Sequence, residues 1–149
     1  MDPPKALETI AVRFKNLYTA SSDTLVLHVM NAMTEEGFSY VPVLENGKMM
    51  GVFSDDTIFQ YVRDQGSLDL RNDMRLKELK GYLAVDAHQN ESFQFASRKE
   101  TVADLEERLK NASLGNKRLE VVFLTENGGP AETLLGMVTL WDLAKGNND

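Results

Sequence analysis

The segment Gly51-Val52-Phe53-Ser54-Asp55-Asp56-Thr57-Ile58 has the same pattern as Gly136-Met137-Val138-Thr139-Leu140-Trp141-Asp142-Leu143. Each copy reads as a glycine, a short apolar strand, a hydroxyl residue and the start of a helix. A pattern that recurs in this way indicates a duplicated structural unit. The copies differ three residues after the hydroxyl, where the first has Thr57 and the second has Asp142.

The repeat extends outward from this phrase. Thr24 aligns with Thr101, Glu45-Asn46-Gly47 with Glu126-Asn127-Gly128, and Gly51 with Gly136. The spacing widens from one anchor to the next, so the second copy carries short insertions. These fall in turns, where added residues are tolerated.

The first copy predicts a helix at 4–14, an extended segment at 16–20 and a helix that begins at Ser21 or Ser22 and ends at Glu36. Val- and Tyr-rich segments on either side of Asn46-Gly47 predict a hairpin with strands at 39–44 and 49–53. A helix is predicted at 55–63, with two acidic residues at its start.

The second copy predicts the same order. Residues 65–73 are polar, and 74–79 predict a short helix before extended segments at 83–95. Ser97 and Glu100 fit a capping box for a helix that continues to Ala112. Strands at 119–125 and 134–138 and a helix at 140–144 follow. We therefore predict an α/β (α+β) fold of two β-α-β-β-α repeats, with domains at 1–66 and 83–149 and a linker at 67–82.

Composition limits the function. The 149 residues are 42% apolar and 26% charged, with no cysteine and a formal net charge of -7. No apolar run approaches the ~20 residues of a membrane span, and the N-terminus lacks the order of a signal peptide. We expect a cytoplasmic protein without a membrane or nucleic-acid partner, because nucleic acids require clustered Lys and Arg. A small anion held by one local basic group stays possible.

The repeated order of helix, Gly37-Phe38-Ser39-Tyr40-Val41-Pro42-Val43, hairpin and Gly51-Val52-Phe53-Ser54 resembles the cystathionine-β-synthase (CBS) domain. Two in tandem resemble a CBS pair, or Bateman module, over about residues 16–143. Thr139-Leu140-Trp141-Asp142 matches the family's Thr/Ser-x-x-Asp motif. The resemblance implies two repeats packed with pseudo-two-fold symmetry, a homodimer, and an unknown effector protein as partner.

It also implies a cleft that binds an adenosyl ligand such as AMP, ADP, ATP, S-adenosylmethionine or cyclic di-AMP, as a regulator and not a required cofactor. In the family the aspartate holds the ribose hydroxyls and the hydroxyl residue helps to hold phosphate, which assigns these roles to Asp142 and Thr139. Thr57 cannot offer a charged bidentate acceptor, so the first cleft is expected to be the weaker. The ligand-binding candidates are Phe95, Ala96, Arg118, Leu119, Glu120, Val121, Thr139 and Asp142 in the second repeat, and Thr19, Phe38, Ser39, Tyr40, Val41, Ser54 and Thr57 in the first.

Other interpretations stay open at this point. Thr139 and Asp142 also fit a helix cap with no ligand, and Phe38, Phe95 and Leu119 fit ordinary core positions. Lys117, Arg118, Arg98 and Lys99 are candidate phosphate ligands or solvated surface charges. Glu120 would repel a phosphate, which favours the alternative of a structural or protein-interaction module with empty clefts.

No enzyme motif is present. Cysteine is absent, the two histidines His28 and His88 lack metal-ligand spacing, and the chain contains no Gly-x-Gly-x-x-Gly motif or P-loop. We therefore expect a non-catalytic module. Trp141 lies inside the second motif, where an exposed side chain would indicate a partner or dimer surface and a buried one would indicate core.

Overall fold

The computed structural model describes residues 5–67, 71–87, 91–112 and 118–146. The chain forms two compact units. Tyr18–Gln89 make the first-repeat unit, and Met1–Leu17 together with Asn90–Asp149 make the second-repeat unit. Each unit contains the order β-α-β-β-α, which confirms the predicted fold class.

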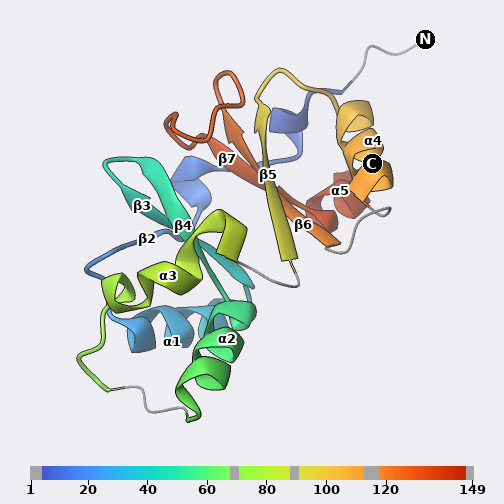
Figure 1. Ribbon diagram of the computed structural model, residues 1–149. Coiled ribbons are helices and arrows are strands. Elements are labelled where there is room, and N and C mark those ends of the chain that lie inside the picture. Colours follow the sequence, from blue (N-terminus) through green and yellow to red (C-terminus); the bar gives the residue numbers. More distant parts are fainter. Residues whose placement is uncertain (1–4, 68–70, 88–90, 113–117, 147–149) are drawn as a thin grey trace. The chain divides into compact units, whose positions relative to one another are not determined.

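The first-repeat unit has a three-stranded sheet in the order β2-β3-β4 (Figure 1). Strand β2 runs parallel to β3, and β4 runs antiparallel to it. Short helical segments follow this repeat. The bounds are β2 Ala20–Ser21, α1 Val26–Glu36, β3 Tyr40–Glu45, β4 Lys48–Ser54, α2 Asp55–Gln65, η3 Leu76–Leu79, α3 Lys80–Leu83 and η4 Val85–Ala87.

The turns of this unit form where the sequence predicts them. Asn46 and Gly47 both have positive φ, 53° and 79°, as a two-residue hairpin of type I′ requires. Gly37 ends α1 with φ 78° and donates its N–H to the carbonyl of Met33. Glycine is the usual residue at such a C-terminal cap because it lacks a Cβ.

The predicted linker at 67–82 is in part core. Met74, Leu76 and Leu79 are buried in the same hydrophobic cluster as Val41 and Phe53. Because much of the segment is polar, its sequence did not indicate that these three apolar residues pack into the core of the unit. Figure 1 shows α3 beside β4.

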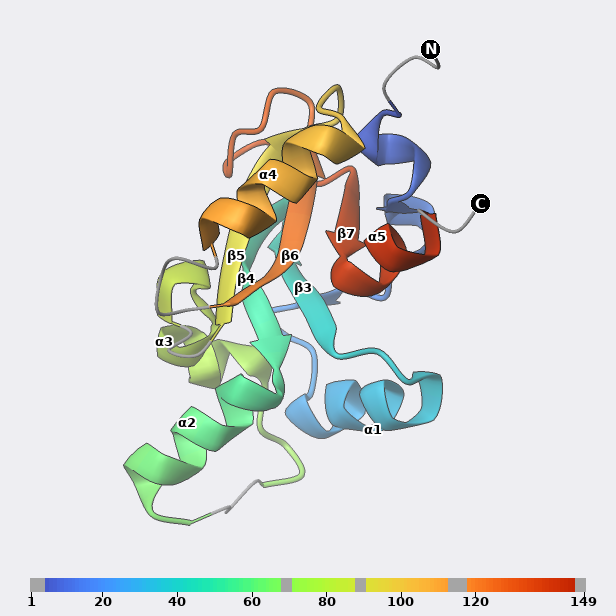
Figure 2. The ribbon, with the colours of Figure 1, turned by 90° about the vertical axis from the view of Figure 1, so that its right-hand side faces the viewer.

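The second-repeat unit has a four-stranded sheet in the order β1-β7-β6-β5, in which β1 is Val12–Arg13 (Figure 2). Strand β5 runs parallel to β6, whereas β7 runs antiparallel to β6. Its core is made by residues such as Ala96, Leu105, Val122 and Val138. The bounds are β5 Glu91–Ser97, α4 Val102–Ala112, β6 Arg118–Thr125, β7 Gly136–Thr139 and α5 Leu140–Gly146.

The N-terminal segment was wrongly predicted as a helix at 4–14. It forms two 3-10 turns, Leu7–Thr9 and Phe14–Asn16, around strand β1, Val12–Arg13. Leu7 is fully buried in the second-repeat core, and its N–H donates to the carbonyl of Glu100 at 2.8 Å. Residues 1–17 therefore group with the second repeat, whereas the sequence assigned them to the first.

Three other predictions need correction. Helix α1 begins at Val26, after the predicted start at Ser21 or Ser22. Residues 80–87 are largely helical, and extended structure begins only at β5.

Helix α4 begins at Val102, so its cap is Thr101 and not Ser97. The N–H of Thr101 donates to Oδ2 of Asp104 at 2.9 Å, and the N–H of Asp104 donates to Oγ1 of Thr101 at 3.2 Å. Because each of these side chains accepts the backbone N–H of the other residue, the capping box lies four residues later than predicted.

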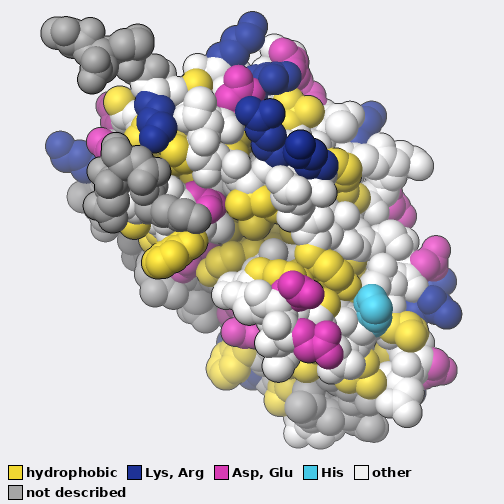
Figure 3. Space-filling model, turned by 180° about the vertical axis from the view of Figure 1, so that it is seen from behind, with side chains coloured by type: hydrophobic (Ala, Val, Ile, Leu, Met, Phe, Trp, Pro, Cys, Tyr) yellow, Lys and Arg dark blue, Asp and Glu magenta, His cyan; other side chains and the backbone are white. Residues whose placement is uncertain are grey.

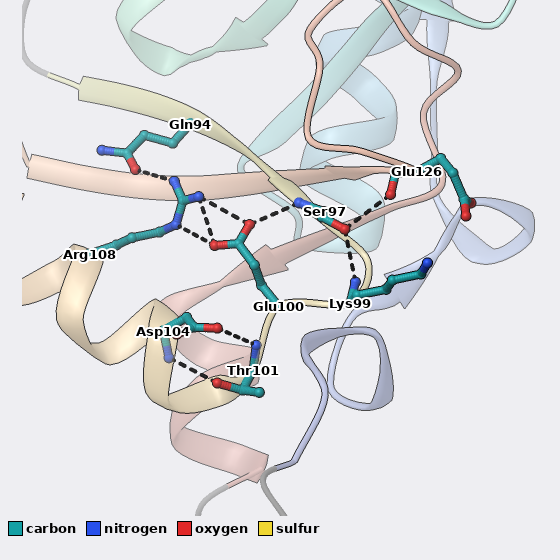
Figure 4. A network of polar contacts seen from close by, with 8 residues as sticks. All are labelled: Gln94, Ser97, Lys99, Glu100, Thr101, Asp104, Arg108 and Glu126. Carbon is teal, nitrogen blue, oxygen red and sulfur yellow. Dashed lines mark hydrogen bonds and ion pairs between the residues drawn. The ribbon is translucent and has the colours of Figure 1, made fainter.

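The contact predicted between Ser97 and Glu100 does form, with the N–H of Ser97 donating to Oε2 of Glu100 at 2.9 Å. It stabilises the turn before α4. Figure 4 shows Arg108 of α4 reaching back to the same carboxylate. The turn and the helix are thereby joined through side chains.

Candidate functional site

Thr139 and Asp142 meet where β7 ends and α5 begins. Oδ2 of Asp142 accepts hydrogen bonds from the N–H of Thr139 at 2.9 Å and from its hydroxyl at 3.0 Å. The N–H of Asp142 in turn lies 3.3 Å from Oγ1 of Thr139. Both residues are partly exposed. Within the described residues Oδ1 of Asp142 accepts no hydrogen bond, so half of the carboxylate is available to a ligand.

The equivalent pair in the first repeat is closed. Ser54 and Thr57 are 1% and 0% exposed. The N–H of Ser54 donates to Oγ1 of Thr57 at 3.1 Å, and that hydroxyl lies 3.4 Å from the carbonyl of Val52. The hydroxyl of Thr57 accepts from one backbone group and donates to another, so the residue has a structural role as a cap.

Four of the second-repeat candidates line one small hollow. Leu119, Glu120 and Val121 of β6 and Thr139 of β7 border a space of about 10 Å³, roughly enough for one water molecule. Leu119 and Val121 are 4% and 1% exposed. A space of this size has no room for a nucleotide base.

The remaining second-repeat candidates do not line this hollow. Ala96 is 1% exposed and belongs to the core. Phe95 is partly buried, with its ring centroid 5.7 Å from that of Phe123. The strand β6 backbone includes Arg118, but its side chain lies outside what the structure describes.

The first-repeat candidates separate into two groups. Phe38 and Ser39 line a hollow of about 640 Å³ between α1 and α2, together with Asp55. Phe38 also stacks on Tyr18, with ring centroids 5.1 Å apart. The others lie elsewhere: Val41 is fully buried, and Thr19, Tyr40, Ser54 and Thr57 do not border this hollow.

The candidate phosphate ligand Arg98 already serves the protein. Its guanidinium donates to Glu8 at 2.9 Å and to Glu126 at 3.2 Å. The hydrogen bonds to Glu126 and Glu8 raise the pKa of Arg98 above its ordinary value. Lys99 is exposed, and Lys117 lies outside the described residues. Arg98 is therefore a structural bridge.

Sequence reasoning missed the apolar groove between α1 and α2. Met30, Met33 and Phe59 line it, and Phe59 is 61% exposed. The available signal was the set of apolar residues Ile58, Phe59 and Val62 in the predicted helix at 55–63. Trp141, the aromatic singled out in the motif, is 74% exposed, which favours the surface interpretation over the core one.

In the described ranges, no three His, Asp or Glu side chains gather in a way that could hold a metal ion. His28 is exposed on α1, and His88 falls in a gap between those ranges. Nor is any helix in the described part of the chain long and apolar enough to cross a bilayer.

Comparison with known proteins gives a family for part of the chain. Residues 11–64 match the family model described as the CBS domain. These residues include α1, β3, β4 and nearly all of α2. The search of curated proteins finds no match.

Solved structures share the fold over nearly the whole chain. A conserved protein from Pyrococcus horikoshii has a TM-score of 0.67 at 17% identity and covers 100% of this chain and 96% of its own. CBSX2 in complex with AMP has a TM-score of 0.68 at 13% identity, with 97% and 96% covered. CbpB in complex with c-di-AMP has a TM-score of 0.65 at 15% identity, with 97% and 85% covered. At such identities the likeness concerns the fold.

Proposed function

We propose that this chain is a regulatory module that binds an adenine nucleotide or another adenosyl ligand, because residues 11–64 match the CBS-domain model and the fold is that of solved CBS-domain structures. Two of the similar structures hold AMP and c-di-AMP. The output of the module passes to a partner protein. A ligand changes that output only if it binds one arrangement of the module better than another.

The observation that carries the proposal is the contrast between Asp142 and Thr57. Both close a capping box, but Thr57 is fully buried, whereas Asp142 is partly exposed and has an oxygen to spare. A carboxylate at a partly exposed corner is suited to the vicinal hydroxyls of a ribose, because hydrogen bonds to a charged acceptor are the stronger ones. We assign the ribose to Asp142 and expect the Thr57 corner to stay empty.

Calorimetric titration of the chain with AMP, ATP, S-adenosylmethionine and cyclic di-AMP tests the proposal. At least one should bind with a measurable heat and raise the melting temperature, because a ligand that binds only the folded state stabilises it. If none of the four gives heat or a melting shift, the adenosyl proposal is wrong.

The alternative is a structural or protein-interaction module with empty clefts. One observation favours it: Thr139 and Asp142 already hydrogen-bond to each other, beside a hollow of only about 10 Å³. Under this alternative Asp142 acts only as a cap. Its replacement would then lower stability and leave the response to all four ligands unchanged.

A further inference from the structure

An exposed basic and aromatic segment lies at the edge of the second-repeat sheet. Arg13, Phe14 and Lys15 are consecutive in the sequence and all three are exposed, Phe14 by 42%. We call them the 13–15 surface. Strand β1, the outermost strand in the order β1-β7-β6-β5, ends at Arg13, and Phe14 begins the 3-10 turn that follows. The segment therefore presents two cations and an aromatic ring to the solvent.

Backbone contacts hold the 13–15 surface in place. Arg13 pairs with Gly136 across the sheet. The N–H of Phe14 donates to the carbonyl of Leu135 at 2.9 Å, and the N–H of Leu17 donates to the carbonyl of Phe14 at 3.0 Å. A surface that is already fixed loses little conformational freedom when a partner binds to it, which favours affinity.

The two cations are not used by the fold. Within the part of the chain that the structure describes, neither Arg13 nor Lys15 forms an ion pair or a side-chain hydrogen bond. By contrast, Arg98 and Arg108 of the same unit are bound to carboxylates. The chain has a formal net charge of -7. Two cations left unpaired in so acidic a protein are available to a negatively charged partner.

We propose that the 13–15 surface binds an acidic segment of a partner protein, in which carboxylates flank an apolar side chain. The guanidinium of Arg13 can donate two parallel hydrogen bonds to one carboxylate, and the ammonium of Lys15 can pair with another. The ring of Phe14 between them can cover the apolar side chain and remove it from water. Figure 3 shows Lys and Arg side chains gathered beside hydrophobic ones on one face of the molecule.

Charge favours a short acidic segment over a membrane or a nucleic acid. Each basic residue near an anionic membrane contributes only about 1 kcal/mol, so two cations give weak attachment. A membrane surface or a nucleic acid would also extend over the acidic remainder of the molecule, which would repel it. A short segment contacts the 13–15 surface alone and avoids this repulsion.

Fluorescence anisotropy of a labelled peptide in which glutamates flank one phenylalanine tests this inference. The full chain should bind the peptide, with an affinity that falls as added salt screens the charges. A peptide with glutamines in place of the glutamates should bind about tenfold more weakly, and the double variant Arg13→Gln, Lys15→Gln should lose a similar factor for the acidic peptide. Both side chains are exposed, so the variant should keep the melting temperature of wild type.

The double variant Lys48→Gln, Lys80→Gln is the matched control. It removes the same charge from two exposed lysines of the first-repeat unit and should leave the peptide affinity unchanged. Phe14→Ala should weaken binding more than Phe59→Ala, although Phe59 is the more exposed ring. The inference is overturned if wild type does not bind the acidic peptide, if the two double variants bind it equally, or if phosphatidylserine vesicles or single-stranded DNA bind more tightly than the peptide.

The inference rests on the part of the proposed function that passes the output to a partner protein, and not on the nucleotide corner. Replacement of Arg13 and Lys15 leaves Thr139 and Asp142 intact, so this variant should give the same heats as wild type with AMP, ATP, S-adenosylmethionine and cyclic di-AMP. Peptide binding without any such heat overturns only the adenosyl proposal. Nucleotide heat without peptide binding overturns only the inference on the 13–15 surface.

Discussion

Oδ2 of Asp142 accepts both the N–H and the hydroxyl of Thr139, at 2.9 and 3.0 Å, and so closes the helix start with half of one carboxylate. In the first repeat the hydroxyl of Thr57 performs the same capping task from a fully buried position. The two copies thus cap the start of the helix in the same way and differ in whether the capping side chain has a further oxygen. Only the second has an acceptor to spare at this position.

Removal of the Thr57 hydroxyl should destabilise the first-repeat unit. Thr57→Val keeps the shape of the side chain but leaves the buried N–H of Ser54 without its acceptor, which costs about 1–3 kcal/mol of unfolding free energy. Thr34→Val is the control. Its exposed hydroxyl donates to the carbonyl of Met30, which water can satisfy instead, so the change should stay within about 0.5 kcal/mol. Urea unfolding measures both; equal losses would contradict a structural role for Thr57.

A side chain at Gly51 should disrupt the packing of α3 on β4. A Cβ there would lie 2.3 Å from the carbonyl oxygen of Leu83, and backbone atoms cannot move aside as a flexible side chain can. Gly51→Ala should cost about 3 kcal/mol or more. Gly81 lies in α3, and nothing outside its own helix would come within 4 Å of a Cβ there, so Gly81→Ala should be neutral or slightly stabilising. Thermal melts of the two variants should therefore diverge, and a similar melting temperature for both would refute this packing.

The clamp of Arg108 on Glu100 should contribute to stability through its geometry as well as its charge. Arg108 donates to both oxygens of Glu100, at 2.8 and 3.1 Å, and to Gln94 at 2.8 Å (Figure 4). Arg108→Lys keeps the charge but loses the planar fork, so we expect a loss of about 1 kcal/mol. Arg63 and Asp64 form an exposed pair 4.0 Å apart, and Arg63→Lys should have no measurable effect. If the unfolding free energy of Arg108→Lys equals that of wild type, the charge of residue 108 alone accounts for its contribution to stability.

Acid should destabilise the fold through three capped carboxylates. Hydrogen bonds from the backbone N–H groups of Thr101, Arg75 and Asn127 lower the pKa of Asp104, Glu78 and Glu132, respectively, below their ordinary values. A carboxylate with a lowered pKa in the folded state stabilises that state fully above its unfolded pKa. This contribution disappears as the pH falls through the lower, folded pKa.

Unfolding free energy should therefore vary little with these groups above about pH 5 and fall below about pH 4. A variant with Asp104→Asn, Glu78→Gln and Glu132→Gln should show a shallower decline than wild type when urea unfolding is measured across this range. An unchanged slope would mean that other groups govern acid stability.

The repeat, the hairpin and the motif could be predicted because each depends on local pattern. Asn46-Gly47 needs positive φ at both residues, and alternate helix and strand periods define α1, β3, β4 and α2. Predictions from local pattern were wrong where contacts between distant segments determine which residues are buried. Leu7 is buried in the second-repeat core although its segment has the spacing of a helix, and Met74 and Leu76 are buried in the first-repeat core although the segment before them is polar.

The candidate site shows the same limit. Spacing identifies Thr139 and Asp142 as a pair, and residue type already separates Asp142 from Thr57. The burial of Thr57 and the partial exposure of Asp142 come only from the structure. Side-chain exposure depends on packing from other elements, which no short motif encodes. The groove shows the same limit, since Ile58, Phe59 and Val62 of α2 border a common hollow only once α1 is placed beside them.

The most direct test of the central claim is a double-mutant cycle between Asp142 and the ribose. The affinities of AMP and 2′-deoxy-AMP would be measured by calorimetry for wild type, Asp142→Thr and Asp104→Thr. Threonine at 142 can keep the cap, as Thr57 does, and Asp104 is the matched capping acid of α4. Wild type and Asp104→Thr should bind AMP about tenfold or more tightly than 2′-deoxy-AMP, and Asp142→Thr should hardly distinguish them. The same discrimination in all three proteins would contradict the assignment of the ribose to Asp142.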